Sequence, residues 1–272
     1  MSSENPSPSA FLPDSVGRFL RGETVARKYV LRVIAVIVAL VLWDQYASTQ
    51  PTYFFPATER IAGALVEQYY EYNLVQAFLG SMWTLFVGFA LAVLVGIPTG
   101  LLMGTNRYAE VVLDPYVTAL YIAPIAALVP LLVFAFGASF ETRVAIVFLF
   151  AVFEIIIDTY KGAKATPKAS INVARSFGAS RLFVLRKVVI PYDMPYIFTG
   201  LRLAIGRGLK GLVLAELLIN FANLGAIIRI WQDDFRLQGV LAIALLFMLV
   251  GIVLTKGMQY LEQRFFYWGD EQ

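Results

Sequence analysis

Six long apolar stretches constrain this 272-residue chain more than any other feature. A helix needs about 20 mostly apolar residues to cross the hydrocarbon core of a bilayer, and each stretch comes close to that length. The composition agrees, because 59% of the residues are hydrophobic and only 15% are charged, which is unusual for a soluble domain. We therefore expect an all-α membrane protein with six transmembrane helices, near residues 29–47, 79–103, 113–136, 143–160, 196–219 and 237–259.

The residue types that are missing from the sequence exclude several kinds of chemistry. The chain has no cysteine and no histidine, which excludes disulfides, thiolate metal sites and catalysis by imidazole. It also lacks the Gly-x-x-x-x-Gly-Lys-Ser/Thr loop that cradles nucleotide phosphates. We expect no catalytic residue, no metal site and no cofactor in this chain, and a net charge of +3 does not imply nucleic-acid binding.

Basic residues are spread unevenly over the segments that flank the apolar stretches. They gather before the first stretch and between the fourth and fifth, whereas the segment after the first stretch has only Arg60 against three glutamates. The positive-inside rule therefore places both termini and the fourth-to-fifth connection in the cytosol. The chain would comprise a cytosolic tail (1–28), a first span (29–47), an extracytoplasmic segment with a surface helix (48–78), a core of five spans (79–260) and a cytosolic tail (261–272).

The connection between the fourth and fifth spans, residues 161–195, begins with the pattern of a short helix. Thr166 followed by Pro167 is typical of a helix N-cap and first turn. Ile171, Ala174 and Phe177 then fall three apart and share one face of that helix.

A second short helix is predicted directly after the first. Gly178 can adopt a positive φ and end the first helix, and Ser180 can cap the second. Pro191 is expected to stop the second helix, because proline lacks an N–H and clashes with the preceding turn. The sequence thus predicts a basic helix-turn-helix between two membrane spans.

This helix-turn-helix resembles the cytosolic "EAA" loop of ABC importer permeases. That loop has the pattern EAA, three residues, Gly, nine residues, Ile, any residue, Leu-Pro. Residues 172–174 stand at the triplet, Gly178 at the glycine, and residues 188–191 at the final motif. The spacing matches throughout, although Asn172 replaces the glutamate and Val173 replaces the first alanine.

Two further segments narrow the resemblance. Residues 177–180 read Phe-Gly-Ala-Ser, and residues 199–207 contain Thr-Gly-Leu-Arg-Leu-Ala followed by Gly-Arg. Both are similar to the permeases for sulfonates, taurine, nitrate and bicarbonate, and the similarity covers roughly residues 74–260.

The resemblance implies a type I ABC importer permease fold in a bacterial inner membrane. Two copies would form the solute pathway as a homodimer, a cytosolic ATPase dimer would hold ATP and magnesium, and an extracytoplasmic binding protein would deliver the solute. The hairpin would insert into a groove of the ATPase as a coupling helix, with Ile171, Ala174 and Phe177 as its buried face. The residues implied in ATPase coupling are Ile171, Asn172, Val173, Ala174, Arg175, Phe177, Gly178, Ala179, Ser180 and Arg181.

Small residues and prolines predict how two of the spans are shaped. Gly88, Gly96, Gly100 and Gly104 recur at multiples of four along the second span, which gives a face that another helix can approach closely. Prolines in the third span, residues 113–136, predict that this helix is bent.

Charged residues within the spans need a reason, because each costs at least about 2.5 kcal/mol in hydrocarbon. The fourth span carries Glu154 and Asp158 on one face, and the fifth carries Arg202, Arg207, Lys210 and Glu216. One reading is that the arginines pair with the two carboxylates of the fourth span and fix the packing of the two spans. The alternative is a substrate pathway lined by Arg207 and Lys210, with Glu154 and Arg202 beside it, that attracts an anion.

The solute and the outer docking surface stay open at this stage. The basic residues and the resembling family favour a small anion such as a sulfonate, nitrate or bicarbonate. The docking site for the binding protein would be the helix near residues 56–72 or the loop 221–236, which contains Trp231, Asp233, Asp234 and Arg236.

Three rival functions are consistent with parts of the sequence. An ATP-independent secondary transporter or channel would explain the intramembrane charges but gives the hairpin no purpose. An intramembrane enzyme would have to rely on Glu154 and Asp158 alone. A purely structural membrane subunit would be distinguished by whether its deletion abolishes uptake of a solute.

Overall fold

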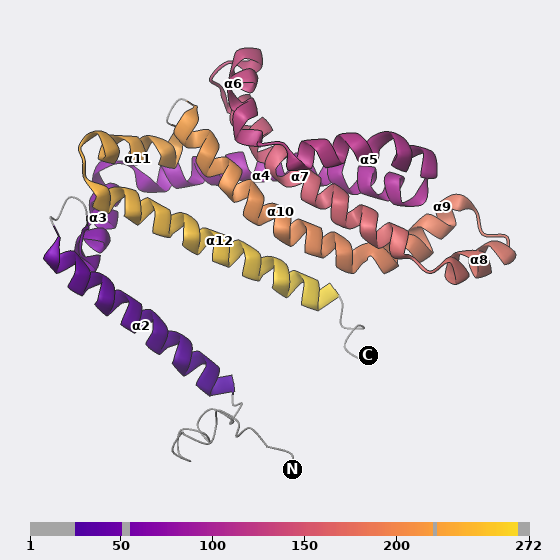
Figure 1. The fold of residues 1–272 in the computed structure, drawn as a ribbon, viewed down its shortest axis with the longest axis horizontal. Helices are drawn as coiled ribbons and strands as arrows, with labels where there is room; N and C mark the ends of the chain where they lie inside the picture. The colour runs from indigo at the N-terminus through magenta and orange to yellow at the C-terminus, as the bar shows by residue number, and fades with distance from the viewer. Residues whose placement is uncertain (1–24, 51–54, 220–221, 266–272) are drawn as a thin grey trace, which may run out of the picture. The chain divides into compact units, whose positions relative to one another are not determined.

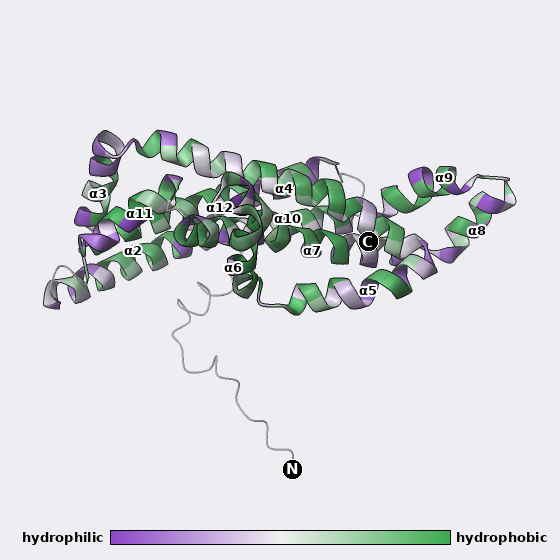
Figure 2. Ribbon diagram, turned by 90° about the horizontal axis from the view of Figure 1, so that it is seen from above, coloured by the Kyte–Doolittle hydropathy of each residue, from purple (hydrophilic) through white to green (hydrophobic). Residues whose placement is uncertain are grey.

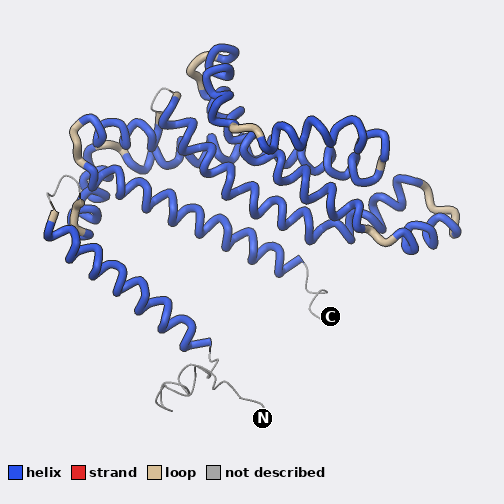
Figure 3. The backbone as a smooth tube through the Cα atoms, in the orientation of Figure 1, coloured by secondary structure: helices blue, strands red, loops and turns tan. Residues whose placement is uncertain are grey.

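The computed structural model describes residues 25–50, 55–219 and 222–265. The expected cytosolic tails at 1–28 and 261–272 and the start of the loop 221–236 therefore fall wholly or partly outside the described residues. Every regular element in the described part of the chain is a helix (Figure 3). The chain divides into two units, Met1–Arg60 and Ile61–Gln272.

The first unit consists mainly of α2, Val25–Thr49, and the short segment that follows it. The C-terminal end of α2 is tied to this segment by side chains. Trp43 Nε1 donates to the carbonyl of Pro56 at 3.0 Å, and the Asp44 carboxylate accepts from Thr58 N at 2.8 Å and Thr58 Oγ1 at 2.7 Å. The aliphatic side chains along α2 are exposed within the chain, as expected of a helix that lies in lipid or against another subunit.

Long apolar helices dominate the second unit (Figures 1 and 2). By length and composition, α2, α4 (Leu74–Thr105) and α12 (Leu237–Phe265) can each cross a membrane. Two bent pairs raise the number to five: α5 with α6, and the helix ending at Leu218 with α11. The sequence predicted six spans, one more than this number. The additional one is the predicted fourth span, which corresponds to α7 (Phe140–Ala165).

Charge and burial explain why α7 differs from the other spans. Every 18-residue window of this helix carries at least three charged side chains, so it fails a test based on hydropathy and charge. Most of its residues between Val144 and Ala163 are nevertheless buried. Helix α7 lies between α4 and α10 (Ile190–Leu218), so its environment is protein rather than lipid.

The third predicted span is broken into two helices, as its prolines indicate. Helix α5 runs Arg107–Ile122 and α6 runs Ile125–Phe136, and their axes differ by 100°. The break falls at Ala123 and Pro124, because a residue before proline is disfavoured in the helical conformation. Gly137 ends α6 with a φ of 73°, a conformation that glycine adopts without a steric penalty.

Glycines set the spacing between α4 and α7, which confirms the predicted packing face. A Cβ on Gly88 would lie 2.7 Å from the Val147 side chain, and a Cβ on Gly100 would lie 2.7 Å from the carbonyl oxygen of Ile156. The backbones therefore touch, and no side chain can be added without moving one helix. Gly200 makes a similar close approach from α10, where its Cβ would lie 3.1 Å from the Asp158 side chain.

The short helices α3 (Thr58–Glu71) and α11 (Asn223–Asp233) pack onto one end of this bundle. The predicted surface helix is present, but it is not simply adsorbed on the surface. Ile61 and Ala64 belong to the same buried cluster as Trp231, and the Gln68 amide donates to the carbonyl of Gly239 at 3.0 Å.

The contact between α4 and α7 predicts a specific sensitivity to added volume. Gly100→Ala should destabilise the protein by about 1–3 kcal/mol, because the new methyl group meets backbone atoms that cannot turn away. Gly257→Ala in α12 is the matched control, since no heavy atom lies within 4 Å of its Cβ position, and there alanine should be neutral or slightly stabilising. Thermal unfolding in detergent measures both, and equal melting temperatures would contradict the packing.

Candidate functional site

The predicted hairpin is formed by α8, Lys168–Ser176, and α9, Arg181–Val184. Gly178 ends α8 with a φ of 79°. Its N–H donates to the carbonyl of Arg175 at 2.9 Å, and the N–H of Ala179 donates to the carbonyl of Ala174 at 3.1 Å. These are the two hydrogen bonds of a Schellman motif. Ser180 then caps α9, as predicted, by accepting from the N–H of Phe183 at 3.3 Å.

The start of α8 differs from the prediction. The N-cap position is occupied by Pro167, without a side-chain hydrogen bond, and not by Thr166. Thr166 is instead the C-cap of α7, and its hydroxyl lies 3.5 Å from the carbonyl oxygen of Gly162. A threonine hydroxyl can bond back to a carbonyl four residues earlier as readily as it can cap forward, so the sequence alone did not separate the two roles.

The prediction that Pro191 stops the second helix is also wrong. The chain continues from α9 through a π-helical turn, Leu185–Val189, directly into α10. In this wide turn the N–H of Ile190 donates to the carbonyl of Leu185, five residues earlier. A shift of the hydrogen-bond register next to proline makes room for its ring and its missing N–H. The hairpin is thus joined to α10 by continuous helix.

The residues that the three-residue spacing placed on one face of α8 differ in exposure. Ile171 and Ala174 pack inside the hairpin, against a cluster that includes Val184 and Val189. Phe177, placed on the same face by its spacing, is 88% exposed. The second half of the hairpin and the end of α7 therefore cover part of Ile171 and Ala174, which are less exposed than Phe177.

A different set of side chains is presented outward. Val173 on α8 and Phe177, the residue that caps the C-terminus of α8, are four residues apart, and both are exposed. On the second arm the exposed apolar residues are Leu182 and Phe183. The exposed polar residues around them are Lys168, Asn172, Arg175, Arg181, Arg186 and Lys187. The sequence analysis named Val173 and Phe177 among the coupling residues but not Leu182 and Phe183, which lie on the second arm.

A polar contact ties α5 to the end of α7 that leads into the hairpin. The Lys164 ammonium donates to the Glu110 carboxylate and, at 2.6 Å, to the Tyr160 hydroxyl. The hydrogen bond with Glu110 is the main reason that the pKa of Lys164 is raised above its usual value, and the bond with Tyr160 adds to it.

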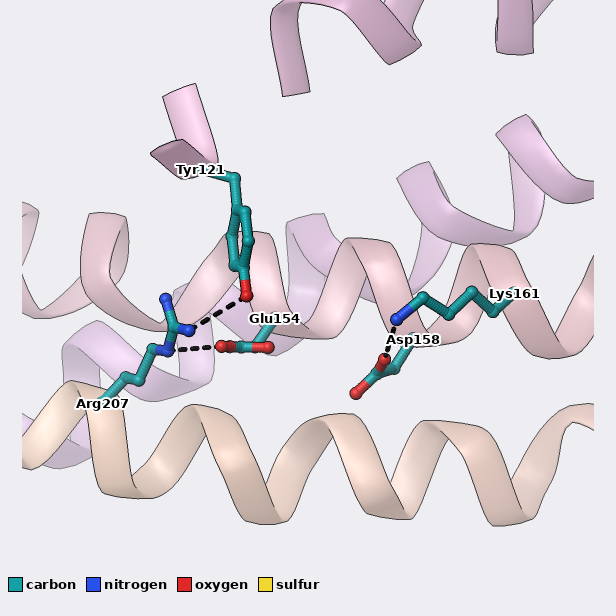
Figure 4. Close-up of polar contacts among 5 residues, drawn as sticks. All are labelled: Tyr121, Glu154, Asp158, Lys161 and Arg207. Atoms are coloured by element: carbon teal, nitrogen blue, oxygen red, sulfur yellow. Dashed lines mark hydrogen bonds and ion pairs between the residues drawn. The ribbon is translucent and has the colours of Figure 1, made fainter. Parts of the chain in front are cut away.

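The charged residues inside the bundle pair largely with one another. Arg207 forms an ion pair with Glu154, and its guanidinium donates to the Tyr121 hydroxyl at 3.0 Å and lies 4.8 Å from the centre of that ring (Figure 4). The Glu154 side chain is 8% exposed and the Arg207 side chain 43% exposed, so this pair joins α5, α7 and α10 at the edge of the bundle. The proposed pairing of Arg207 with a carboxylate of α7 is present.

Arg202 and Asp158 do not form the ion pairs that the sequence analysis considered for them. Arg202 pairs with Glu262 of α12 at 2.9 Å and not with either carboxylate of α7. Asp158 instead accepts from Lys161 at 3.1 Å, one turn along its own helix (Figure 4). Lys210 is exposed and makes no ion pair or hydrogen bond with any residue that the structure describes.

The two predicted outer docking candidates form one structure. Arg236 donates to both oxygens of Glu67, at 2.7 and 2.6 Å, and its guanidinium stacks 3.9 Å from the centre of the Trp231 ring. The hydrogen bonds with Glu67 hold the pKa of Arg236 above its usual range. Trp231 is 1% exposed and therefore cannot contact a partner, whereas Asp233, Asp234 and Phe235 remain exposed beside it.

The described helices thus form a bundle with several candidate membrane spans and a basic hairpin that exposes apolar residues. The family described as the inner membrane component of binding-protein-dependent transport systems matches residues 92–267. The chain belongs to this family of ABC importer permeases.

Individual relatives agree over almost the whole chain. A putative ABC transporter permease of Methanocaldococcus jannaschii is 32% identical, with 89% of this chain and 93% of the relative covered. The taurine transport system permease of Escherichia coli K12 is 28% identical over 91% and 92% of the two chains. The nitrate import permease of Leptolyngbya laminosa is 28% identical over 95% and 93%. These relatives are transport subunits rather than enzymes.

The fold is also found in a solved structure. An amino acid ABC transporter crystallised with histidines matches with a TM-score of 0.62 and 19% identity, covering 74% of this chain and 97% of that one. At this identity the match supports the helical permease fold and carries no information about the solute.

The ion pair between Arg207 and Glu154 predicts a coupling that a double-mutant cycle can measure. Glu154→Gln and Arg207→Gln should each destabilise the protein, because each leaves the other side chain without its partner. The double variant should lose less than the sum, with a coupling free energy of about 1–2 kcal/mol from unfolding in detergent. Lys161→Gln, at an ion pair whose lysine is 60% exposed, should have little effect. Strict additivity at Glu154 and Arg207 would show that the pair does not stabilise the bundle.

Proposed function

We propose that this chain is the transmembrane subunit of an ATP-driven importer, in which two copies form the solute pathway and a separate ATPase dimer holds ATP and magnesium. The observation that carries the proposal is the hairpin. It is a compact, capped element with an apolar outer surface, and it is joined to α10 without a break.

The outer surface of the hairpin has the composition of a protein interface. Its centre is formed by Val173, Phe177, Leu182 and Phe183, which are exposed in the chain by itself. Aromatic and aliphatic residues at the centre with arginines at the rim are typical of docking sites. We assign the coupling contact to these four residues, with Asn172, Arg175 and Arg181 at the rim. In this proposal Ile171, Ala174, Gly178, Ala179 and Ser180 serve mainly to fold the hairpin.

The helical connection explains how the ATPase would move the pore. The hairpin core contains Ile171 and Ala174 from the first arm and Val184 from the second, so the two arms move as one body. The second arm continues through Leu185–Val189 into α10. A rigid-body displacement of the hairpin therefore reaches α10 and, through the close contact at Gly200, α7.

The proposed topology places the hairpin and both termini in the cytosol of a bacterial cell, with the chain in the inner membrane. The distribution of basic residues supports this orientation, and the family is an inner-membrane component. The opposite surface, formed by α3, α11 and the exposed residues Asp233, Asp234 and Phe235, would then receive an extracytoplasmic solute-binding protein.

The transported solute is proposed to be a small anion. Relatives named for taurine and nitrate import support this choice, and the fifth predicted span carries several basic side chains. An ATP-independent transporter or channel is the alternative, but in it the exposed apolar hairpin would have no partner.

The coupling contact can be tested at the most exposed residue of the hairpin. Phe177→Ser should reduce ATPase retention during purification and ATP-driven uptake at least tenfold, because Phe177 is 88% exposed and contributes little to the fold of the chain alone. Phe235→Ser is the matched control, since this phenylalanine is 83% exposed on the outer surface, and the ATPase should stay bound.

Normal melting temperatures for both variants would show that Phe177→Ser weakens binding of the ATPase and does not unfold the chain. The proposal fails if Phe177→Ser keeps the ATPase and transports at the normal rate.

A further inference from the structure

Lys210 is the basic residue of the fifth predicted span that the bundle leaves without compensation. Arg202 is paired with Glu262, and Arg207 is paired with Glu154 and stacked on Tyr121. Lys210 lies one turn beyond Arg207 on α10, is exposed, and contacts no carboxylate among the described residues. Glu216, the carboxylate of the same span, is buried and accepts hydrogen bonds from Asn223 and the N–H of Gly225, so it does not pair with Lys210.

The depth of Lys210 makes simple contact with lipid costly. The predicted span ends near Ile219, and nine residues of helix correspond to about 13 Å, which is more than a lysine side chain reaches. Lys256 of α12 is also exposed, but it lies three residues from the predicted end of its span, so its side chain can reach the interface. A lysine at the depth of Lys210 needs an acidic partner or water.

The face of α10 that carries Lys210 is not covered by other parts of the chain that the structure describes. Leu203, Gly206, Arg207 and Lys210 follow the three- and four-residue spacing of one helix face, and no heavy atom lies within 4 Å of the Cβ position of Gly206. This face therefore has open space directly beside the lysine. Arg207 marks its border with α5 through the contact with Tyr121 (Figure 4).

We propose that the face of α10 at Gly206 and Lys210 forms a wall of the water-filled solute pathway, and that Lys210 makes this wall attractive to small anions. This inference rests on the proposed function, because it assigns the pathway of that same permease. It divides the basic residues of the span into two roles: Arg202 and Arg207 hold the bundle together, and Lys210 faces the solute. Two copies of the chain would contribute two such lysines.

The absence of cysteine from the sequence makes the first test direct. Single cysteines are introduced as Lys210→Cys and, as the matched control, Leu249→Cys in the assembled transporter. Leu249 is 59% exposed on α12, at a similar depth to Lys210, because the neighbouring Gly251 approaches Leu209 of α10. The probes are the membrane-impermeant methanethiosulfonates carrying a sulfonate or a trimethylammonium group, applied to membrane vesicles of both orientations.

We expect Lys210→Cys to react at least tenfold faster than Leu249→Cys, because thiolates form and react in water but not in lipid. Equal, slow labelling of both positions would overturn the proposal, since it would place Lys210 in lipid or under a second subunit.

The second test measures the charge of the pathway. Gly206→Cys is labelled with each of the two reagents, with Lys210 present or replaced in Lys210→Gln. One charge about 6 Å away in a watery environment should change each rate about threefold and in opposite directions, so Lys210→Gln should lower the ratio of anionic to cationic labelling about tenfold. Lys256→Gln is the control and should leave the ratio unchanged. An unchanged ratio in Lys210→Gln would overturn the role of this lysine.

The tests distinguish a wrong pathway assignment from a wrong proposed function. If the ATPase remains bound to the hairpin while Lys210→Cys is inaccessible, the permease assignment stands and the pathway assignment is wrong. If Lys210→Cys is accessible but no ATPase binds, the pathway stands and the coupling to ATP is wrong.

Discussion

The close packing of α7 against α4 and α10 is the interaction on which the rest of the structure depends. Glycines of α4 meet α7 at contacts where a Cβ would fall within 3 Å of its atoms, and Gly200 of α10 approaches the side chain of Asp158. Association of helices in a membrane gains little from the hydrophobic effect and depends on such packing. Because α7 is enclosed by its neighbours, it can carry Glu154 at a depth where a charge in lipid would be costly.

The packing of α7 against α10 also bears on how movement of the hairpin would be transmitted to the bundle. The hairpin lies between α7 and α10 in the chain, and it is joined to α10 through the π-helical turn Leu185–Val189. A hairpin connected by flexible loops would absorb a displacement, whereas one connected by continuous helix passes it on. The polar contact of Lys164 with Glu110 adds a second attachment, from the hairpin end of α7 to α5.

Much of the fold could be predicted from the sequence, because apolar length and small-residue spacing act locally along each helix. The helices, the glycine face and the bend at Pro124 follow from such local rules. The ion pair between Arg202 and Glu262 could not be predicted, since 60 residues separate them in the chain. Pro191 was misjudged because a π-helical turn accommodates it. For the hairpin, the pattern identified the apolar residues but not which of them the two arms cover, and that decision depends on tertiary packing around Val184.

Cross-linking from the hairpin tip in native membranes tests the central claim most directly. A photoreactive phenylalanine analogue at position 177 would be activated in intact cells, and the attached peptide identified by mass spectrometry. The account predicts a cytosolic chain that contains a nucleotide-phosphate loop. Attachment to an extracytoplasmic protein, or to lipid alone, would contradict it.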